Sequence, residues 1–274
     1  MVYAPIDDPF DLAPVDEVHL ERTPLEVVIF QVRFPGSYIP LKEAIDSGAV
    51  ARALGREYPF AVTQNVLQVV FQPGRPPQQK PADVQVLQMS DASQVWTLNV
   101  SQDSVSVTTT KYESRKDLLA RASKIFEALA ETASPPSLSR LGVRYINRVT
   151  DLAAIDALVQ DGLNTEVQPM HRLWATRPNA IRHSMNDLLY EWPGTATKLQ
   201  ARLGILAPGQ VLDGALSPAA TSSWVLDIDT FDEGPQGFDA SRIADQLKDL
   251  AQRAYRFFRW IVTPKGLAQF GAEQ

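Results

Sequence analysis

The 274-residue chain contains no cysteine. This excludes disulfide bonds, metal sites built on thiolates and a cysteine nucleophile. Histidine is scarce as well, and the spacing of His19, His171 and His183 matches no zinc motif. The phosphate-binding loop, the glycine motif of dinucleotide-binding proteins and the G-x-S-x-G motif of hydrolases are missing too. The commonest hydrolase and nucleotide-binding chemistries therefore lack their usual signatures.

Long apolar runs and a surplus of positive charge are also absent. No stretch approaches about 18 consecutive apolar residues, the length that spans a membrane. The first residues, Met-Val-Tyr-Ala-Pro-Ile-Asp-Asp, lack the basic and apolar regions of a signal peptide. The formal net charge of −6 is opposite in sign to that of most nucleic-acid binders. We therefore expect a cytoplasmic protein without a membrane or nucleic-acid partner.

The residues that are present describe a globular chain with a substantial core. Hydrophobic residues make up 45% and charged residues 21%, which is ordinary for a soluble protein. Twenty prolines outnumber fourteen glycines, which favours fixed turns over flexible linkers. The length fits one large domain or two of ordinary size.

Hydrophobic periodicity divides the chain into an arm and two halves. Residues 1–22 are rich in proline and acid, which predicts an extended arm on the body of the protein or a disordered tail. In the first half, residues 23–136, β-branched and aromatic runs alternate with helical spacing. A loop is expected at 74–81, and Ser114 resembles the N-cap of a helix. The predicted strands are 25–34, 66–71, 84–89, 95–100 and 104–112, and the predicted helices are 41–56 and 117–133.

The second half, residues 137–274, repeats this order at the level of pattern. The first half reads β-α-β-β-β-β-α and the second reads β-α-β-β-β-α, with an irregular stretch at 164–180. We therefore predict an α+β fold of two similar halves. Each would be an antiparallel sheet covered by helices on one face, as two lobes or with one continuous sheet. The predicted strands are 138–149, 181–192, 198–206 and 223–231, and the predicted helices are 152–163 and 241–262.

Alternation separates three strands of the second half into apolar and charged faces. Arg144 and Arg148 share one face of 138–149, and Arg202 lies on the polar face of 198–206. Asp227 and Asp229 share a face of 223–231. If the apolar faces all meet the long C-terminal helix, these charged faces coincide. They would form either a lattice of ion pairs or a site in which the two aspartates hold a divalent cation and the arginines bind a phosphate or carboxylate.

The end of the C-terminal helix mixes arginine with aromatic residues. Tyr255, Phe258, Arg259 and Trp260 cannot all face one core, which suggests a contact surface for a partner chain. A nucleic-acid stacking surface is an alternative that the acidic net charge opposes. A helix lying between two sheets, and apolar on two sides for that reason, is a further alternative.

Several segments together resemble a sporadically distributed prokaryotic family of uncharacterised proteins of about this length. They include the Leu-Gly-Val-Arg-Tyr-Ile-Asn run that begins at Leu141 and the Leu-Asp-Ile-Asp strand that begins at Leu226. The others are the Pro-Leu-Glu-Val-Val strand, the strand at Trp96 that leads to Thr-Thr-Lys-Tyr, and the Val-Thr-Pro-Lys-Gly segment that begins at Val262. The resemblance implies an accessory role, in defence or a toxin–antitoxin pair, and no defined activity.

Two functional hypotheses follow. The first is a non-catalytic protein-binding or assembly module that needs no cofactor and binds a protein partner or a second copy of itself. The second is an enzyme that uses Mg²⁺ or Mn²⁺ at Asp227 and Asp229 and acts on a phosphate-containing substrate. In that case Arg144 and Arg202 would bind the phosphate.

Overall fold

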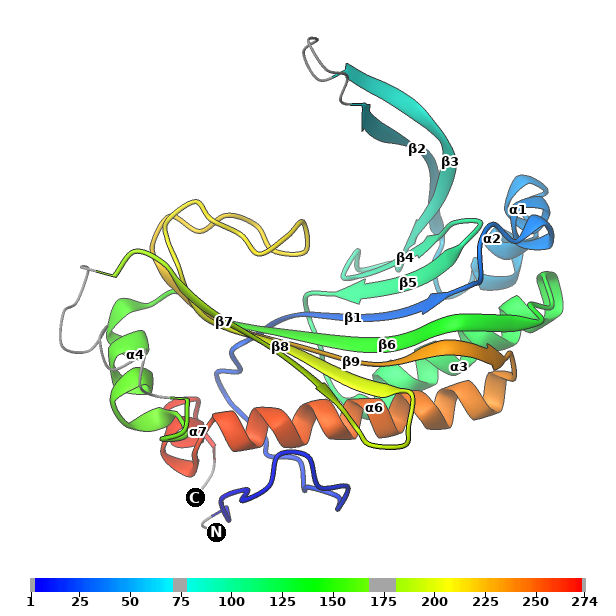
Figure 1. Cartoon of the computed structure of the whole chain (residues 1–274). Helices are drawn as coiled ribbons and strands as arrows, with labels where there is room; N and C mark the ends of the chain where they lie inside the picture. Colours follow the sequence, from blue (N-terminus) through cyan, green and yellow to red (C-terminus); the bar gives the residue numbers. More distant parts are fainter. Residues whose placement is uncertain (1–2, 71–77, 168–180, 273–274) are drawn as a thin grey trace. The chain divides into compact units, whose positions relative to one another are not determined.

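The computed structural model describes residues 3–70, 78–167 and 181–272 (Figure 1). In this part of the chain, helices combine with one nine-stranded sheet, in the order β2-β3-β4-β5-β1-β6-β9-β8-β7. This confirms the predicted α+β class. The pairs β2–β3, β3–β4, β4–β5, β7–β8 and β8–β9 are antiparallel.

The chain divides into two compact units. Unit 1 contains residues 1–28, 143–232 and 248–274, and unit 2 contains residues 29–142 and 233–247. The sequence predicted a boundary at 136/137. The boundaries of the two compact units lie within four elements, which are β1 (Leu25–Arg33), β6 (Ser137–Val149), β9 (Ser223–Gly237) and α6 (Ala240–Ile261).

The core of unit 1 lies between its strands and α6 (Figure 1). Besides β9, unit 1 contains the strands β7 (Ser184–Glu191) and β8 (Thr197–Leu206). Because side chains alternate along a strand, one face of β8 and β9 is apolar and packs against one side of the helix. The buried side chains of this core include Leu199, Leu203, Ile205, Trp224, Leu226 and Ile228 from the strands and Ala254, Phe257, Phe258 and Ile261 from α6.

Three short helical segments complete unit 1. The predicted helix 152–163 is α-helical only over α4 (Leu152–Ala157), and a π-helical turn, η1 (Leu158–Gly162), follows it. The predicted helix 241–262 corresponds to α6, which ends at Ile261 before Pro264. A further short helix, α7 (Pro264–Gln269), begins at that proline, with the Thr263 hydroxyl as N-cap. The Thr263 amide donates to the Gly162 carbonyl oxygen at 2.9 Å, which joins α7 to η1.

Unit 2 is built on the other strands and on α3 (Arg115–Thr132). The strands are β2 (Phe60–Val70), β3 (Gln78–Ser90), β4 (Trp96–Val100), β5 (Ser104–Thr109) and parts of β1, β6 and β9. The Ser114 hydroxyl accepts a hydrogen bond from the Asp117 amide at 3.1 Å, so the predicted cap is confirmed. Phe126 of α3 packs edge-on against Phe30 of β1, with ring centroids 5.9 Å apart.

Three predictions for unit 2 were wrong in detail. The single helix expected at 41–56 is broken into α1 (Ile39–Asp46) and α2 (Ala49–Leu54). Gly48 between them has φ +70°, a left-handed conformation that interrupts a right-handed helix. Residues 78–81, expected in a loop, belong to β3, and β2 begins six residues before the predicted start at 66.

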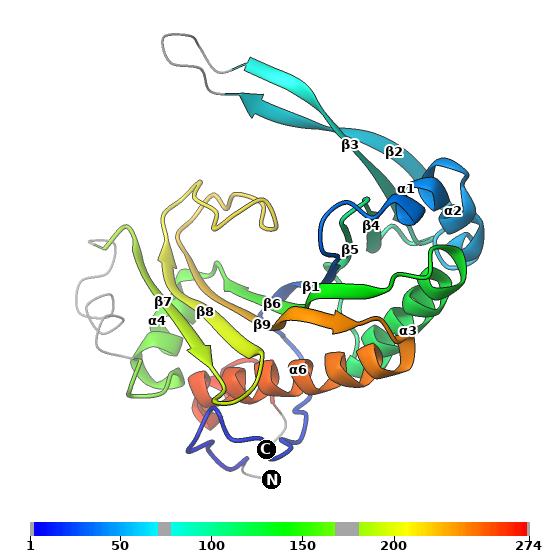
Figure 2. The same ribbon diagram turned by 45° about the vertical axis from the view of Figure 1, so that its right-hand side comes forward.

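The β2–β3 hairpin extends beyond the strand that it pairs with. β3 pairs with β4 only through Leu87–Ser90, whereas it pairs with β2 along most of its length. Within unit 2 the hairpin therefore continues as a two-stranded ribbon past β4 (Figure 2). The rest of the predicted loop at 74–81 and most of the predicted irregular stretch at 164–180 lie outside the described residues. No helix in the described ranges is long and apolar enough to span a membrane.

Candidate functional site

The polar face of unit 1 is the side of β6, β8 and β9 that points away from α6. The connection between β8 and β9, residues 207–222, lies on this side of the strands (Figure 1). Leu216 in this connection is buried, and the Thr221 hydroxyl donates to the Thr150 carbonyl oxygen at 3.1 Å. The connection therefore covers part of the face that the sequence analysis identified as charged.

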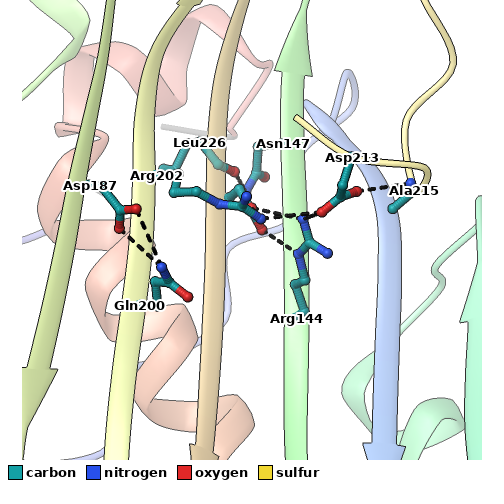
Figure 3. Close-up of polar contacts among 9 residues, drawn as sticks. Arg144, Asn147, Asp187, Gln200, Arg202, Asp213, Ala215 and Leu226 are labelled. Carbon is teal, nitrogen blue, oxygen red and sulfur yellow. Dashed lines mark hydrogen bonds and ion pairs between the residues drawn. The ribbon is translucent and has the colours of Figure 1, made fainter. Parts of the chain in front are cut away.

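Four side chains meet on this face, and we call them the Arg–Asp cluster: Arg144 of β6, Arg202 of β8, Asp227 of β9 and Asp213 of the β8–β9 connection (Figure 3). Arg144 binds Asp227 through two parallel hydrogen bonds, Nε to Oδ1 at 2.7 Å and Nη2 to Oδ2 at 2.9 Å. Arg202 Nε donates to the same Oδ2 at 2.9 Å, and Asp227 lies opposite Arg202 in the strand register. Asp213 Oδ2 bridges the two arginines, 2.6 Å from Arg144 and 3.3 Å from Arg202.

The electrostatics of the cluster are those of closed ion pairs. Burial by itself disfavours the charged form of Arg144, but the hydrogen bonds and charges of Asp227 and Asp213 outweigh it and raise the arginine's pKa. Burial would likewise raise the pKa of Asp213. The hydrogen bond from the Ala215 amide and the contact with Arg144 outweigh burial here as well and lower that pKa. Two guanidinium groups face two carboxylates, so the formal charges within the cluster cancel.

This environment opposes the binding of a cation at Asp227. Its side chain is only 2% exposed, and both carboxylate oxygens already accept hydrogen bonds from guanidinium groups. A divalent cation there would lie beside two positive charges. Asp229 lies on the same face of β9, opposite Gln200 in the register. Within the described ranges, no three histidine, aspartate or glutamate side chains form a group that could hold a metal ion.

Arg148, which the sequence placed with Arg144 and Arg202, has different partners. Its Nη1 donates to the Ser217 carbonyl oxygen at 2.8 Å and to Glu26 Oε1 at 3.3 Å. The Arg148 side chain is 4% exposed, and its Nε has no hydrogen-bond partner within the described structure. Arg148 therefore fixes the β8–β9 connection beside β1 and does not extend the Arg–Asp cluster.

The aromatic end of α6 binds the N-terminal segment of its own chain. The Tyr255 hydroxyl accepts from the Val18 amide at 2.7 Å, and Arg259 Nη1 donates to the Asp16 carbonyl oxygen at 3.2 Å. Phe258 and Arg259 are buried, and Tyr255 and Trp260 pack against the core of unit 1 as partly buried side chains. The surface proposed for a partner is thus covered in large part from within the chain.

Arg256 is the main polar anchor of this N-terminal segment. It is buried, and it donates to the carbonyl oxygens of Asp8 at 2.8 Å and Ala13 at 3.0 Å and to Asp11 Oδ2 at 3.0 Å. Phe10 stacks on Tyr190 of β7, with ring centroids 3.6 Å apart. In the sequence, the acidic arm and the arginine-containing end of the helix are recognisable as two separate features. Their opposite charges were the available signal that they bind each other.

The outer strand of unit 1, β7, was not singled out by the sequence. It is the last strand in the order and pairs with β8 alone among the described strands. Its centre carries two adjacent leucines that are largely exposed, Leu188 at 42% and Leu189 at 56%. Because neighbouring residues point to opposite faces, Leu188 lies on the α6 side and Leu189 on the polar side. Two consecutive apolar residues in a strand with otherwise polar neighbours were the signal that could have identified this edge.

The backbone of β7 also directs hydrogen-bonding groups toward its outer side. The Trp192 amide donates to the Thr197 carbonyl oxygen at 3.1 Å, so even-numbered residues of β7 direct their backbone groups toward β8. Odd-numbered residues direct theirs away from the sheet. In the described structure no strand lies beyond them. These outward-directed residues are Met185, Asp187, Leu189 and Glu191.

Comparisons of the chain with protein-family models, with curated proteins and with solved structures found no match.

Proposed function

We propose that this protein is a non-catalytic protein-binding module, and that its partner adds a strand to the outer edge of β7. The observation that carries the proposal is an edge with no described strand beyond it, together with the exposed Leu188 and Leu189 at its centre. Sheet edges bind extended chains through main-chain hydrogen bonds, while side-chain contacts supply the selectivity. Natural proteins usually protect such an edge with charge, proline or a covering segment.

The alternative enzyme hypothesis has less support. Its proposed ligands and anion-binding arginines are bonded to one another in the Arg–Asp cluster, so their charges are already compensated. The resemblance noted in the sequence still suggests an accessory role, in defence or a toxin–antitoxin pair, and a protein-binding module is compatible with either.

The two-half organisation also stays a proposal, with support from the strand order. In each half the first strand lies beside the last one: β1 neighbours β5, and β6 neighbours β9. The remaining strands of each half then follow outward in reverse chain order. If the halves are related in this way, β7 and β2 are the corresponding outer strands.

Peptide selection on the full-length protein tests the binding function. A library of unstructured peptides is selected against immobilised protein, and the dissociation constants of enriched peptides are measured with wild type, Leu189→Pro and Leu189→Ala. The Leu189 amide faces outward, so proline removes a donor from the edge without removing a β7–β8 hydrogen bond. Alanine keeps the amide and serves as the matched control.

We expect Leu189→Pro to weaken binding at least about tenfold, equivalent to roughly 1.4 kcal/mol, and Leu189→Ala to weaken it much less. The proposal fails if no peptide is enriched, or if enriched peptides bind Leu189→Pro as tightly as wild type.

A further inference from the structure

The edge of β7 is suited to one partner in particular. We infer that a second copy of this chain pairs with it, β7 against β7 in antiparallel orientation, around a twofold axis at Leu188. This inference rests on the proposed strand addition and names its partner.

The hydrogen-bonding pattern permits such self-pairing. With the axis perpendicular to the sheet at Leu188, Asp187 lies opposite the partner's Leu189, and Met185 lies opposite the partner's Glu191. All of these residues have odd numbers, so their backbone groups face outward on both copies. Each pair can therefore exchange both main-chain hydrogen bonds. Leu188 itself, with its backbone groups bonded toward β8, takes the closely spaced non-hydrogen-bonded position.

Charge selects this register over its neighbours. If the axis passed through Asp187, that carboxylate would lie directly opposite its own copy. If the axis passed through Leu189, Asp187 would lie opposite the partner's Glu191. Like charges directly opposite each other destabilise a strand pair. The Leu188 register avoids both conflicts and places a leucine, not a second acid, opposite Asp187.

Contacts within unit 1 leave the edge ready for this pairing. Gln200 Nε2 donates to Asp187 Oδ1 at 3.2 Å (Figure 3), and Lys198 pairs with Glu191 at 3.0 Å. Both acidic side chains are thus held toward β8, away from the outer edge. Leu188 would then meet the partner's Leu188 on the α6 side, which buries two side chains that are each 42% exposed in the single chain.

Cysteine crosslinking tests the register directly, because the chain has no cysteine of its own. Four variants carry one cysteine each: Leu188→Cys, Leu189→Cys, Leu152→Cys on α4 and Val62→Cys on β2. The last two replace residues that are 39% and 50% exposed, and so serve as comparisons from unit 1 and from the other outer strand. Purified variants are oxidised with diamide at several concentrations, the rate of covalent dimer formation is measured, and circular dichroism verifies folding.

We expect Leu188→Cys to crosslink at least about tenfold faster than the other three. Residues opposite each other at a non-hydrogen-bonded position have Cα atoms about 4.5 Å apart, within the range that a disulfide spans. Copies of residue 189 would lie diagonally, about 7–8 Å apart, which is too far. The double variant Asp187→Cys/Leu189→Cys should crosslink rapidly, since these positions face each other.

Other outcomes overturn the inference in recognisable ways. Equal rates for Leu188→Cys and Leu152→Cys would indicate random collision. A rate for Leu189→Cys that equals that of Leu188→Cys would exclude the register, and a fastest rate for Val62→Cys would move the contact to β2. If crosslinking fails while selected peptides still depend on the Leu189 amide, β7 binds a different protein and the proposed function stands.

Discussion

Arg144 and Asp227 face each other across β6 and β9 in a two-point, nearly parallel contact, with Nε–Oδ1 and Nη2–Oδ2 distances of 2.7 and 2.9 Å. This geometry matches the planar fork of a guanidinium to the two oxygens of a carboxylate. Asp227 also forms an ion pair with Arg202. One buried carboxylate therefore compensates the positive charges of two arginines, one from each strand beside β9. The ion pairs of the cluster join neighbouring strands, so replacing its members should change the free energy of unfolding.

Replacing Asp227 with asparagine is expected to destabilise the protein by about 3 kcal/mol or more, because it leaves two partly buried guanidinium groups with too little negative charge. Urea unfolding at neutral pH measures this free energy. Asp213→Asn is the matched comparison: Asp213 contacts the same arginines, but its side chain is 36% exposed, so solvent screens the contact and the expected loss is below about 1 kcal/mol. Equal losses for the two variants would contradict the assignment of Asp227 as the centre of the cluster.

The lowered pKa of Asp213 predicts a pH dependence with a defined sign. A carboxyl whose pKa is lower in the folded state stabilises the protein above its unfolded pKa, about 3.9, and this contribution is lost as the pH falls through the folded value. The difference in unfolding free energy between wild type and Asp213→Asn should therefore be constant from pH 7 to pH 5 and shrink below about pH 4. Urea titrations at pH 7, 5 and 3 measure it. A difference that grows on acidification would have the wrong sign.

Local sequence patterns predicted the parts of this molecule that depend on alternation. Period-two spacing was enough to place Arg144, Arg202 and Asp227 on faces that coincide, because adjacent strands with a common apolar face must also share their polar face. Asp213 could not be foreseen, since the β8–β9 connection that carries it has no periodicity. The register that places Arg202 opposite Asp227 likewise depends on the pairing of two strands, which neither strand specifies alone.

The break at Gly48 and the edge position of β7 illustrate two other limits. A helical stripe of apolar residues continues through 41–56 in the sequence, but one glycine in a left-handed conformation was enough to divide it. Strand order is set by which strands pair, and β7 becomes an edge only because β6 and β9 occupy the interior positions. The surface predicted on α6 has a related limit: the sequence did not show that Tyr255 and Arg259 bind the chain's own N-terminal segment.

That segment provides the last prediction. Arg256→Met keeps most of the buried stem but removes the three hydrogen bonds that reach Asp8, Ala13 and Asp11. Hydrogen bonds to a charged donor contribute about 1.5–3 kcal/mol each when one partner is lost, so the segment should detach at least about tenfold more often. Hydrogen exchange followed by mass spectrometry would show this at the Val18 amide, which is bonded to Tyr255.

Exposed Arg242, near the start of the same helix, gives the matched control, and Arg242→Met should leave exchange in the N-terminal segment unchanged. Amides of α3 in unit 2 distinguish detachment of the segment from global unfolding, because only global unfolding exposes them. If α3 and the N-terminal segment accelerate together in Arg256→Met, the arginine stabilises the whole fold. If only the segment accelerates, Arg256 specifically anchors it, and the aromatic end of α6 becomes available to other chains each time the segment leaves.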